Sequence, residues 1–265
     1  MKSKILDIHG KEKGSIELPH CFSQKIREDV VSKILEAKKS MQPYAPSLVA
    51  GKQHAAKGKI VHRRHVWRSG YGRGISRVPR KIMSRRGSQF AWVAAEIPFA
   101  RGGMRAHPPK VISQMKKLRV NKKEMKLALM SALSATTSPK EMTKRYKSLE
   151  HAKIDNLPLV VEAKISTLNT KELISSLKKI LGEQLFKVAL KIKKIRSGKG
   201  RRRGRKYKSN AGALIITGKE EELKSHVFDS ANSKNVSITD LAKGGVGRLT
   251  VYTEQAIKEI GERCK

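Results

Sequence analysis

The chain has 265 residues, of which 59 are lysine or arginine and 22 are aspartate or glutamate, so its formal net charge is +37 at pH 7. Self-repulsion at this level works against a compact isolated protein, so the composition indicates a polyanionic partner, nucleic acid first. No apolar run reaches the roughly 18 residues of a membrane span, the N-terminus lacks the features of a signal peptide, and the two cysteines, Cys21 and Cys264, lie at opposite ends of the chain. We therefore expect no membrane partner, no secretion signal and no disulfide framework, as in a protein of a reducing interior.

Hydrophobic periodicity predicts regular elements on both sides of a long basic segment. Ahead of it the sequence predicts strands over residues 4–8 and 15–18 and a helix over about 24–41, and behind it two helices that end near residues 136 and 146. From residue 156 onward, apolar runs of strand length alternate with helical patterns. The predicted strands span residues 158–161, 213–217, 236–238 and 249–253, and the predicted helices span 170–181, about 183–192, 219–229, 239–243 and about 253–259. This alternation predicts an α/β fold with a mostly parallel sheet covered by helices.

The segment between Pro43 and Pro109 has no hydrophobic period that could form a core, and it contains fourteen basic residues against one acid, Glu96. We expect such a segment to be unstructured in isolation and to take its shape from a surrounding polyanion. Its arginines outnumber its lysines, and aromatic side chains such as Trp67 and Tyr71 are interleaved with them. Arginine binds phosphate in a bidentate manner and stacks on bases, so the pattern favours nucleic-acid binding over a merely solvated tail. We predict a globular domain over residues 1–44 and 109–265, with a long irregular basic loop over 45–108.

A second basic tract, residues 193–208, holds ten basic residues, three glycines and no acid. It falls between a predicted helix and a predicted strand, so we expect a basic loop within the globular domain. Its glycines at 198, 200 and 204 approach the spacing of a dinucleotide-binding fingerprint, but no strand precedes them and the last interval is one residue too long. We expect these glycines to let the backbone approach phosphate closely, without a nucleotide cofactor.

Other chemistries find little support in the sequence. His62 and His65 are three residues apart, but no cysteine or paired carboxylate accompanies them, and the surrounding arginines would repel a cation. No serine or cysteine stands with histidine and aspartate in a catalytic pattern. The glutamates at 220–222 are interpreted as the first turn of a helix, where negative charge suits the helix dipole. We therefore expect no metal, no cofactor, no catalytic residue and no enzyme activity.

Six tracts of the sequence resemble one known family and follow its order along nearly the whole chain. They are GYGRGISRVPR (70–80), RAHPPK (105–110), NKKEMKLALMSALSATT (121–137), DNLPLVV (155–161), SGKGRRRGRKYK (197–208) and GRLTVYTEQAI (247–257). Together they resemble large-subunit ribosomal protein four in its archaeal and eukaryotic branch. The sequence ends soon after the last predicted helix, without the long basic tail of eukaryotic members, so the resemblance is to the archaeal members.

The resemblance implies a structural constituent of the large ribosomal subunit in the cytoplasm. Its implied partners are large-subunit ribosomal RNA (rRNA), neighbouring ribosomal proteins and, transiently, the nascent polypeptide. In this family the long loop penetrates rRNA and helps to line the polypeptide exit tunnel, opposite ribosomal protein twenty-two. Carried over by motif, the loop tip comprises Gly72, Arg73, Gly74, Arg77, Pro79 and Arg80. The candidate rRNA-binding residues are Arg63, Arg64, Arg68, Arg73, Arg77, Arg80, Arg85, Arg86, Arg101, Arg105, His107, Lys110, Lys199, Arg201, Arg202, Arg203, Arg205 and Lys206.

Two other classes of protein stay open from the residues alone. A chromatin-type architectural protein would share the basic composition and would bind duplex DNA as well as RNA. An RNA-modifying α/β enzyme would need a cofactor pocket at the carboxyl ends of its strands. Competition between structured rRNA and duplex DNA distinguishes the first class, and binding of a nucleotide or methyl donor distinguishes the second.

Overall fold

The computed structural model describes residues 1–40, 60–103, 105–107, 118–149, 154, 156–225 and 227–264. The chain divides into two compact units. One comprises Met1–Glu36 and Val120–Lys265, and we call it the α/β unit; the other comprises Ala37–Arg119, and we call it the arm.

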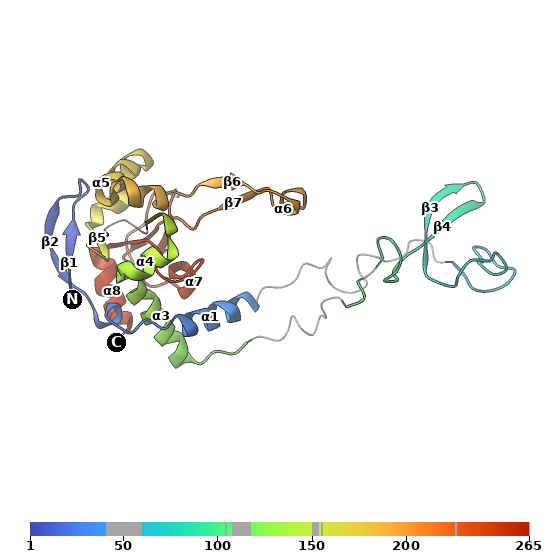
Figure 1. The fold of residues 1–265 in the computed structure, drawn as a ribbon, viewed down its shortest axis with the longest axis horizontal. Coiled ribbons are helices and arrows are strands. Elements are labelled where there is room, and N and C mark those ends of the chain that lie inside the picture. The colour runs from blue at the N-terminus through green and yellow to red at the C-terminus, as the bar shows by residue number, and fades with distance from the viewer. Residues whose placement is uncertain are drawn as a thin grey trace. The chain divides into compact units, whose positions relative to one another are not determined.

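A six-stranded sheet forms the centre of the α/β unit, in the order β2-β1-β5-β10-β8-β9. Figure 1 labels its strands β1, β2 and β5. Its strands are β1 (Lys2–Leu6), β2 (Glu12–Glu17), β5 (Leu159–Val161), β8 (Leu214–Thr217), β9 (Asp229–Asn232) and β10 (Thr250–Thr253). β1 and β2 form an antiparallel hairpin, and every other neighbouring pair in the sheet is parallel. The predicted α/β fold with a mostly parallel sheet is confirmed.

The central strands are buried on both faces, which explains why their sequences are apolar throughout instead of alternating. Leu214 and Ile216 of β8 belong to the core on one face, and Ile215 between them belongs to the core on the other. Helices cover both faces. The first hydrophobic core, which contains Leu214 and Ile216, also includes residues of η1 (His20–Phe22), α1 (Glu28–Ser40), α3 (Lys122–Thr137), α7 (Ile238–Leu241) and α8 (Glu254–Cys264). The second hydrophobic core, which contains Ile215, includes residues of α4 (Pro139–Arg145), η3 (Lys147–Leu149), η4 (Ala163–Thr167) and α5 (Thr170–Ala189).

The helix α5 covers the two helices predicted at 170–181 and about 183–192. Its helical geometry is interrupted at Gly182, whose φ of 69° and ψ of 173° suit a residue without a Cβ. The gap between the two predicted helices, at residue 182, therefore corresponds to a kink within one helix. In the described part of the chain, no helix is both long and apolar enough to cross a membrane.

Two elements predicted between residues 219 and 238 are wrong. In place of the helix at 219–229 the described residues up to Phe228 form a loop, and β9 then pairs in parallel with β8. In place of the strand at 236–238, Ser237 caps the short helix α7. Glu221, expected in a helical first turn, is buried and accepts hydrogen bonds from the Gly218 amide (2.8 Å) and the Thr253 hydroxyl (2.6 Å). Pairing with a distant strand outweighed the local helical periodicity, which carries no information about such contacts.

The arm contains an antiparallel hairpin of β3 (Arg80–Arg86) and β4 (Gln89–Ala94). The turn between the strands uses Gly87, with φ 55°, and the register places Arg85 opposite Phe90 and Ile82 opposite Trp92. The basic segment, predicted as a long irregular loop, thus contains a regular hairpin over residues 80–94. Cross-strand aromatic and aliphatic pairs supply the local contacts that the hydrophobic period did not indicate.

A second hairpin, which we call the ribbon, spans residues 193–209 of the α/β unit. Its strands β6 (Lys193–Ile195) and β7 (Tyr207–Ser209) are antiparallel, and the short helix α6 (Lys199–Arg202) lies at its tip (Figure 1). The basic tract at 193–208 was predicted as a loop. Instead, it forms a regular two-stranded structure that fixes the spacing of its cations.

Candidate nucleic-acid interface

The ribbon is a surface of uncompensated positive charge. Every residue from 193 to 209 except Gly200 is exposed. Across the described residues, acids of the α/β unit pair with lysines and arginines elsewhere, and none pairs with any of the ten basic residues of the ribbon. Such a surface repels itself in isolation and is stabilised by a polyanion.

The tip of the ribbon is held by its own backbone. Gly198 and Gly204 flank α6 with positive φ values of 75° and 77°. The Arg196 amide donates to the Lys206 carbonyl at 2.8 Å, and the Arg205 amide donates to the Gly200 carbonyl at 3.0 Å. Because main-chain bonds define the turn, the exposed side chains of residues 201–203 are not needed to hold it and can bind a ligand.

An apolar pair lies between the cations of the ribbon. Ile195 and Tyr207 are directly opposite in the register, and their exposed fractions are 55% and 53%. The Lys206 ammonium lies 5.4 Å from the centre of the Tyr207 ring. Exposed aromatic groups next to cations are the arrangement that stacks on bases while the cations hold phosphate.

The base of the ribbon is fastened to the end of α5 by Asn210. Its side-chain amide donates to the carbonyls of Leu190 (2.7 Å) and Val188 (3.3 Å), and its carbonyl oxygen accepts from the Ile192 amide (2.8 Å). Asn210, on the leaving chain, thus satisfies three backbone groups of the entering chain. The two ends of the ribbon are thereby joined beside the end of α5.

A buried guanidinium strengthens this attachment. Arg248 is 1% exposed and donates to the carbonyls of Ala211 (2.8 Å), Gly212 (3.1 Å) and Asp240 (2.7 Å), and to a carboxylate oxygen of Asp229 (2.6 Å). Burial by itself would raise the pKa of Asp229, but hydrogen bonds from Lys191, Arg248 and Lys243 outweigh it and hold that pKa well below its usual range. The chain leaving the ribbon is thereby tied to β9 and α7.

The arm combines arginines with aromatic rings. The Arg64 guanidinium lies 4.5 Å from the centre of the Tyr71 ring and donates to the Tyr71 hydroxyl at 2.9 Å. The ring of Trp67, which is 62% exposed, meets the Phe90 ring edge-on with 5.5 Å between ring centres, and the Phe90 and Trp92 ring centres are also 5.5 Å apart. A cavity of about 670 Å³ opens here, lined by Arg64, His65, Val66, Trp67, Ser69, Tyr71 and Arg73. Its lining offers both stacking surfaces and phosphate-binding groups.

Most of the predicted RNA-binding side chains of the arm are accessible. Arg68 and Arg80 are half-buried, and the Arg80 guanidinium is engaged by the Ser76 carbonyl at 3.0 Å. Lys110 lies outside the described residues. Of the predicted tip residues, Gly72 and Gly74 have positive φ values of 77° and 65°, and the Pro79 carbonyl accepts from the Ala95 amide at 2.8 Å. The exposed candidates are Arg63, Arg64, Arg73, Arg77, Arg85, Arg86, Arg101, Arg105 and His107.

Sequence reasoning found the basic residues and missed the groups that position them. Asn210, Arg248 and Asp229 were not predicted to matter, although their contacts define the base of the ribbon. The only sequence feature that could have indicated a buried role for Arg248 is its position directly before an apolar strand. In the described ranges, no group of three or more His, Cys, Asp or Glu side chains could hold a metal ion.

An α/β unit with a basic ribbon, joined to an arginine-rich aromatic arm, defines a structural nucleic-acid-binding protein. Residues 16–263 match the ribosomal protein L4/L1 family. Relatives described as large ribosomal subunit protein uL4 include those of the archaea Nanoarchaeum equitans, 38% identical over 99% of this chain and 98% of the relative, and Methanococcoides burtonii, 38% identical over 97% of each. The relative of that description from Methanospirillum hungatei is 35% identical over 98% of this chain and 99% of its own.

The chain belongs to the ribosomal protein L4/L1 family. The resemblance inferred from the sequence tracts is confirmed. Members of this family are structural, non-enzymatic proteins, which agrees with the expectation that the chain is not an enzyme.

Proposed function

We propose that this chain is a structural constituent of the large ribosomal subunit that binds large-subunit rRNA through both the ribbon and the arm. The observation that carries the proposal is the ribbon. Its ten exposed basic side chains have no acidic partner among the residues that the structure describes, and its base is held by Asn210 and Arg248. A protein that needed this surface only for solubility would gain nothing from anchoring it. An anchored cationic hairpin instead has a defined geometry for meeting a folded RNA.

The physical basis is charge neutralisation combined with stacking. Each cation that meets a phosphate releases condensed counterions, which makes binding strongly salt-dependent. Tyr207 on the ribbon and Trp67 and Tyr71 on the arm can stack on unpaired bases, each contact being worth roughly 1–3 kcal/mol. The two basic surfaces thereby hold RNA segments that are distant in the RNA sequence.

The proposal extends to the position of the arm in the ribosome. We propose that residues 45–108 penetrate rRNA, that the tip from Gly72 to Arg80 helps to line the polypeptide exit tunnel near ribosomal protein twenty-two, and that it transiently contacts the nascent chain. The turn at residues 71–74 supports this, since glycines at 72 and 74 allow a compact backbone and expose Arg73. Crosslinking from position 73 in translating ribosomes, with the nascent chain or that protein as the expected targets, tests the placement.

A triple substitution tests the ribbon as an rRNA site. Replacing Arg201, Arg202 and Arg203 with alanine should weaken binding to a fragment of large-subunit rRNA and reduce the slope of log affinity against log salt by roughly two to three. The matched control replaces three exposed lysines of α5, Lys171, Lys178 and Lys179, which removes the same charge elsewhere on the α/β unit. Equal effects of both variants would mean that net charge, and not the ribbon, determines binding.

Selectivity is tested by competition between two nucleic acids for the wild-type protein. Structured rRNA should compete for the wild-type protein far more effectively than duplex DNA at equal phosphate concentration. Equal competition would favour a chromatin-type architectural protein instead.

A further inference from the structure

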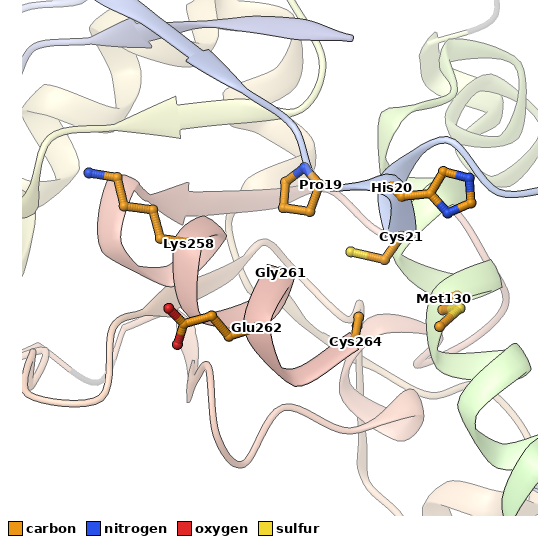
Figure 2. Close-up of a pocket in the computed structure, with 8 residues that line it drawn as sticks. All are labelled: Pro19, His20, Cys21, Met130, Lys258, Gly261, Glu262 and Cys264. Atoms are coloured by element: carbon orange, nitrogen blue, oxygen red, sulfur yellow. The ribbon is translucent and has the colours of Figure 1, made fainter.

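The fold brings the two cysteines of the chain together. Cys21 belongs to η1, near the start of the chain, and Cys264 is the last residue of α8. Both line one groove of about 570 Å³ (Figure 2). Cys21 belongs to the first hydrophobic core, and the half-buried Cys264 packs against that core. Each thiol shifts the pKa of the other, as expected for sulfur atoms that lie close together. Their separation in the sequence had indicated no disulfide partner for either.

A close approach of α8 to the segment before η1 creates this pair. A Cβ built at Gly261 would lie 2.7 Å from Pro19 Cγ, so the absence of a side chain at 261 lets the last turn of α8 come this near. The end of that helix is held by Arg263, which donates to the carbonyls of Ser233 (2.9 Å) and Val236 (3.0 Å). These contacts hold the end of α8, which carries Cys264, beside the segment that carries Cys21.

We propose that Cys21 and Cys264 form a redox-responsive pair, which a low-molecular-mass disulfide converts into an intramolecular disulfide that ties the C-terminal helix to the N-terminal region. This inference is independent of RNA binding. In a reducing cytoplasm such a disulfide forms transiently, as a response to oxidation and not as a permanent part of the fold.

The step is a thiol–disulfide exchange in two stages. The Cys264 thiolate attacks one sulfur of the small disulfide, forming a mixed disulfide and releasing one small thiolate, which takes up a proton. Cys21 then loses its proton and attacks the Cys264 sulfur, closing the protein disulfide and releasing the second small thiol. The protein is oxidised by two electrons, and one small disulfide is reduced to two thiols.

The local environment assigns these roles. Interaction with the Cys21 thiol lowers the pKa of Cys264 to about 7, against the opposite effect of burial, and the positive charges of Arg263 and Lys126 also lower it. The same interaction, together with burial, raises the pKa of Cys21 above its ordinary range. Cys264 is half-buried and Cys21 is 3% exposed, so the groove admits a small reagent to Cys264 first. His20, Lys258 and Glu262 are the other titratable groups that line the groove.

Hydroxyethyl disulfide added to the native protein tests the proposal. Both free thiols should disappear, the mass should fall by two hydrogens, and tryptic digestion should release residues 14–25 joined to residues 264–265. In concentrated urea the cysteines are far apart, and the ratio of intramolecular to mixed disulfide should drop by at least about tenfold. The oxidised protein should also unfold at higher urea concentration, because the crosslink restricts the unfolded chain, and a dithiol reductant should reverse the shift.

Two variants separate the roles of the cysteines. With Cys21→Ala the mixed disulfide at Cys264 should accumulate, and with Cys264→Ala the buried Cys21 should stay reduced in the native protein. Accumulation of the mixed disulfide in the wild-type protein, or of disulfide-linked dimers, would overturn the proposal. Neither result would bear on rRNA binding.

Discussion

Replacing Arg248 with methionine tests whether the ribbon is anchored by the buried guanidinium. Arg248 donates to the Asp229 carboxylate and to three backbone carbonyls at 2.6–3.1 Å, and more weakly to the Ala213 carbonyl at 3.5 Å. Methionine keeps a flexible apolar stem of similar length and removes every donor. The carbonyls at 211, 212 and 240 would then be left without this partner in a buried region.

The expected loss follows from these contacts. A hydrogen bond to a charged group contributes about 1.5–3 kcal/mol, and removing one partner of a buried ion pair costs about 3–5 kcal/mol because the other partner stays buried. Without Arg248, Asp229 still pairs with Lys191 and Lys243, and its side chain is 24% exposed. The free-energy cost of leaving this carboxylate without Arg248 is therefore smaller than the cost for a fully buried, unpaired charge. We expect the free energy of unfolding to fall by about 3–4 kcal/mol.

Urea unfolding followed by circular dichroism measures this loss. The matched control is Arg263→Met, because Arg263 also donates to two backbone carbonyls but is exposed. It should cost about 0.5–1.5 kcal/mol. If Arg248→Met costs no more than Arg263→Met, burial of the guanidinium does not stabilise the base of the ribbon, and the argument is refuted.

Three further predictions concern the α/β unit. The wild-type protein should be more stable than Asp229→Asn, and this difference should be complete above the ordinary carboxyl pKa of 3.8 and should disappear as the pH falls through the lower pKa of folded Asp229. Urea unfolding midpoints of both proteins across a pH series measure the difference. A difference that persists in strong acid would contradict the prediction. Gly247→Ala should destabilise more than Gly198→Ala, which should cost about 1 kcal/mol. Both glycines have φ 75°, but a Cβ at 247 would lie 2.7 Å from a backbone oxygen of α4 while the space at 198 is open; equal melting temperatures of the two variants would refute this. Ile195→Ala with Tyr207→Ala should weaken rRNA binding by roughly tenfold without changing the salt slope, because stacking releases no counterions; a reduced slope would mean that the pair acts through the neighbouring cations.

Much of the fold could be predicted from the sequence because an apolar run of strand length is buried whichever elements pack against it. The core strands β5, β8 and β10 were predicted for this reason, and the basic tracts identified the candidate RNA-binding surfaces. The edge strand β9 was missed because its residues, DSAN, carry no strand signal and are ordered by pairing with β8. The hairpins in the arm and the ribbon were missed because their stability comes from cross-strand pairs within tracts dominated by charge.

Composition and hydrophobic periodicity alone predicted a basic α/β protein with a polyanionic partner. Net charge and the spacing of apolar residues are properties of the sequence that do not depend on which residues meet in the fold. The tertiary structure decided which residues meet across long sequence distances. It buried Arg248 against the carbonyls at the base of the ribbon, and it placed Cys21 beside Cys264. Such contacts depend on the packing of α8, β9 and η1 around one sheet, and no local pattern in the sequence encodes that packing.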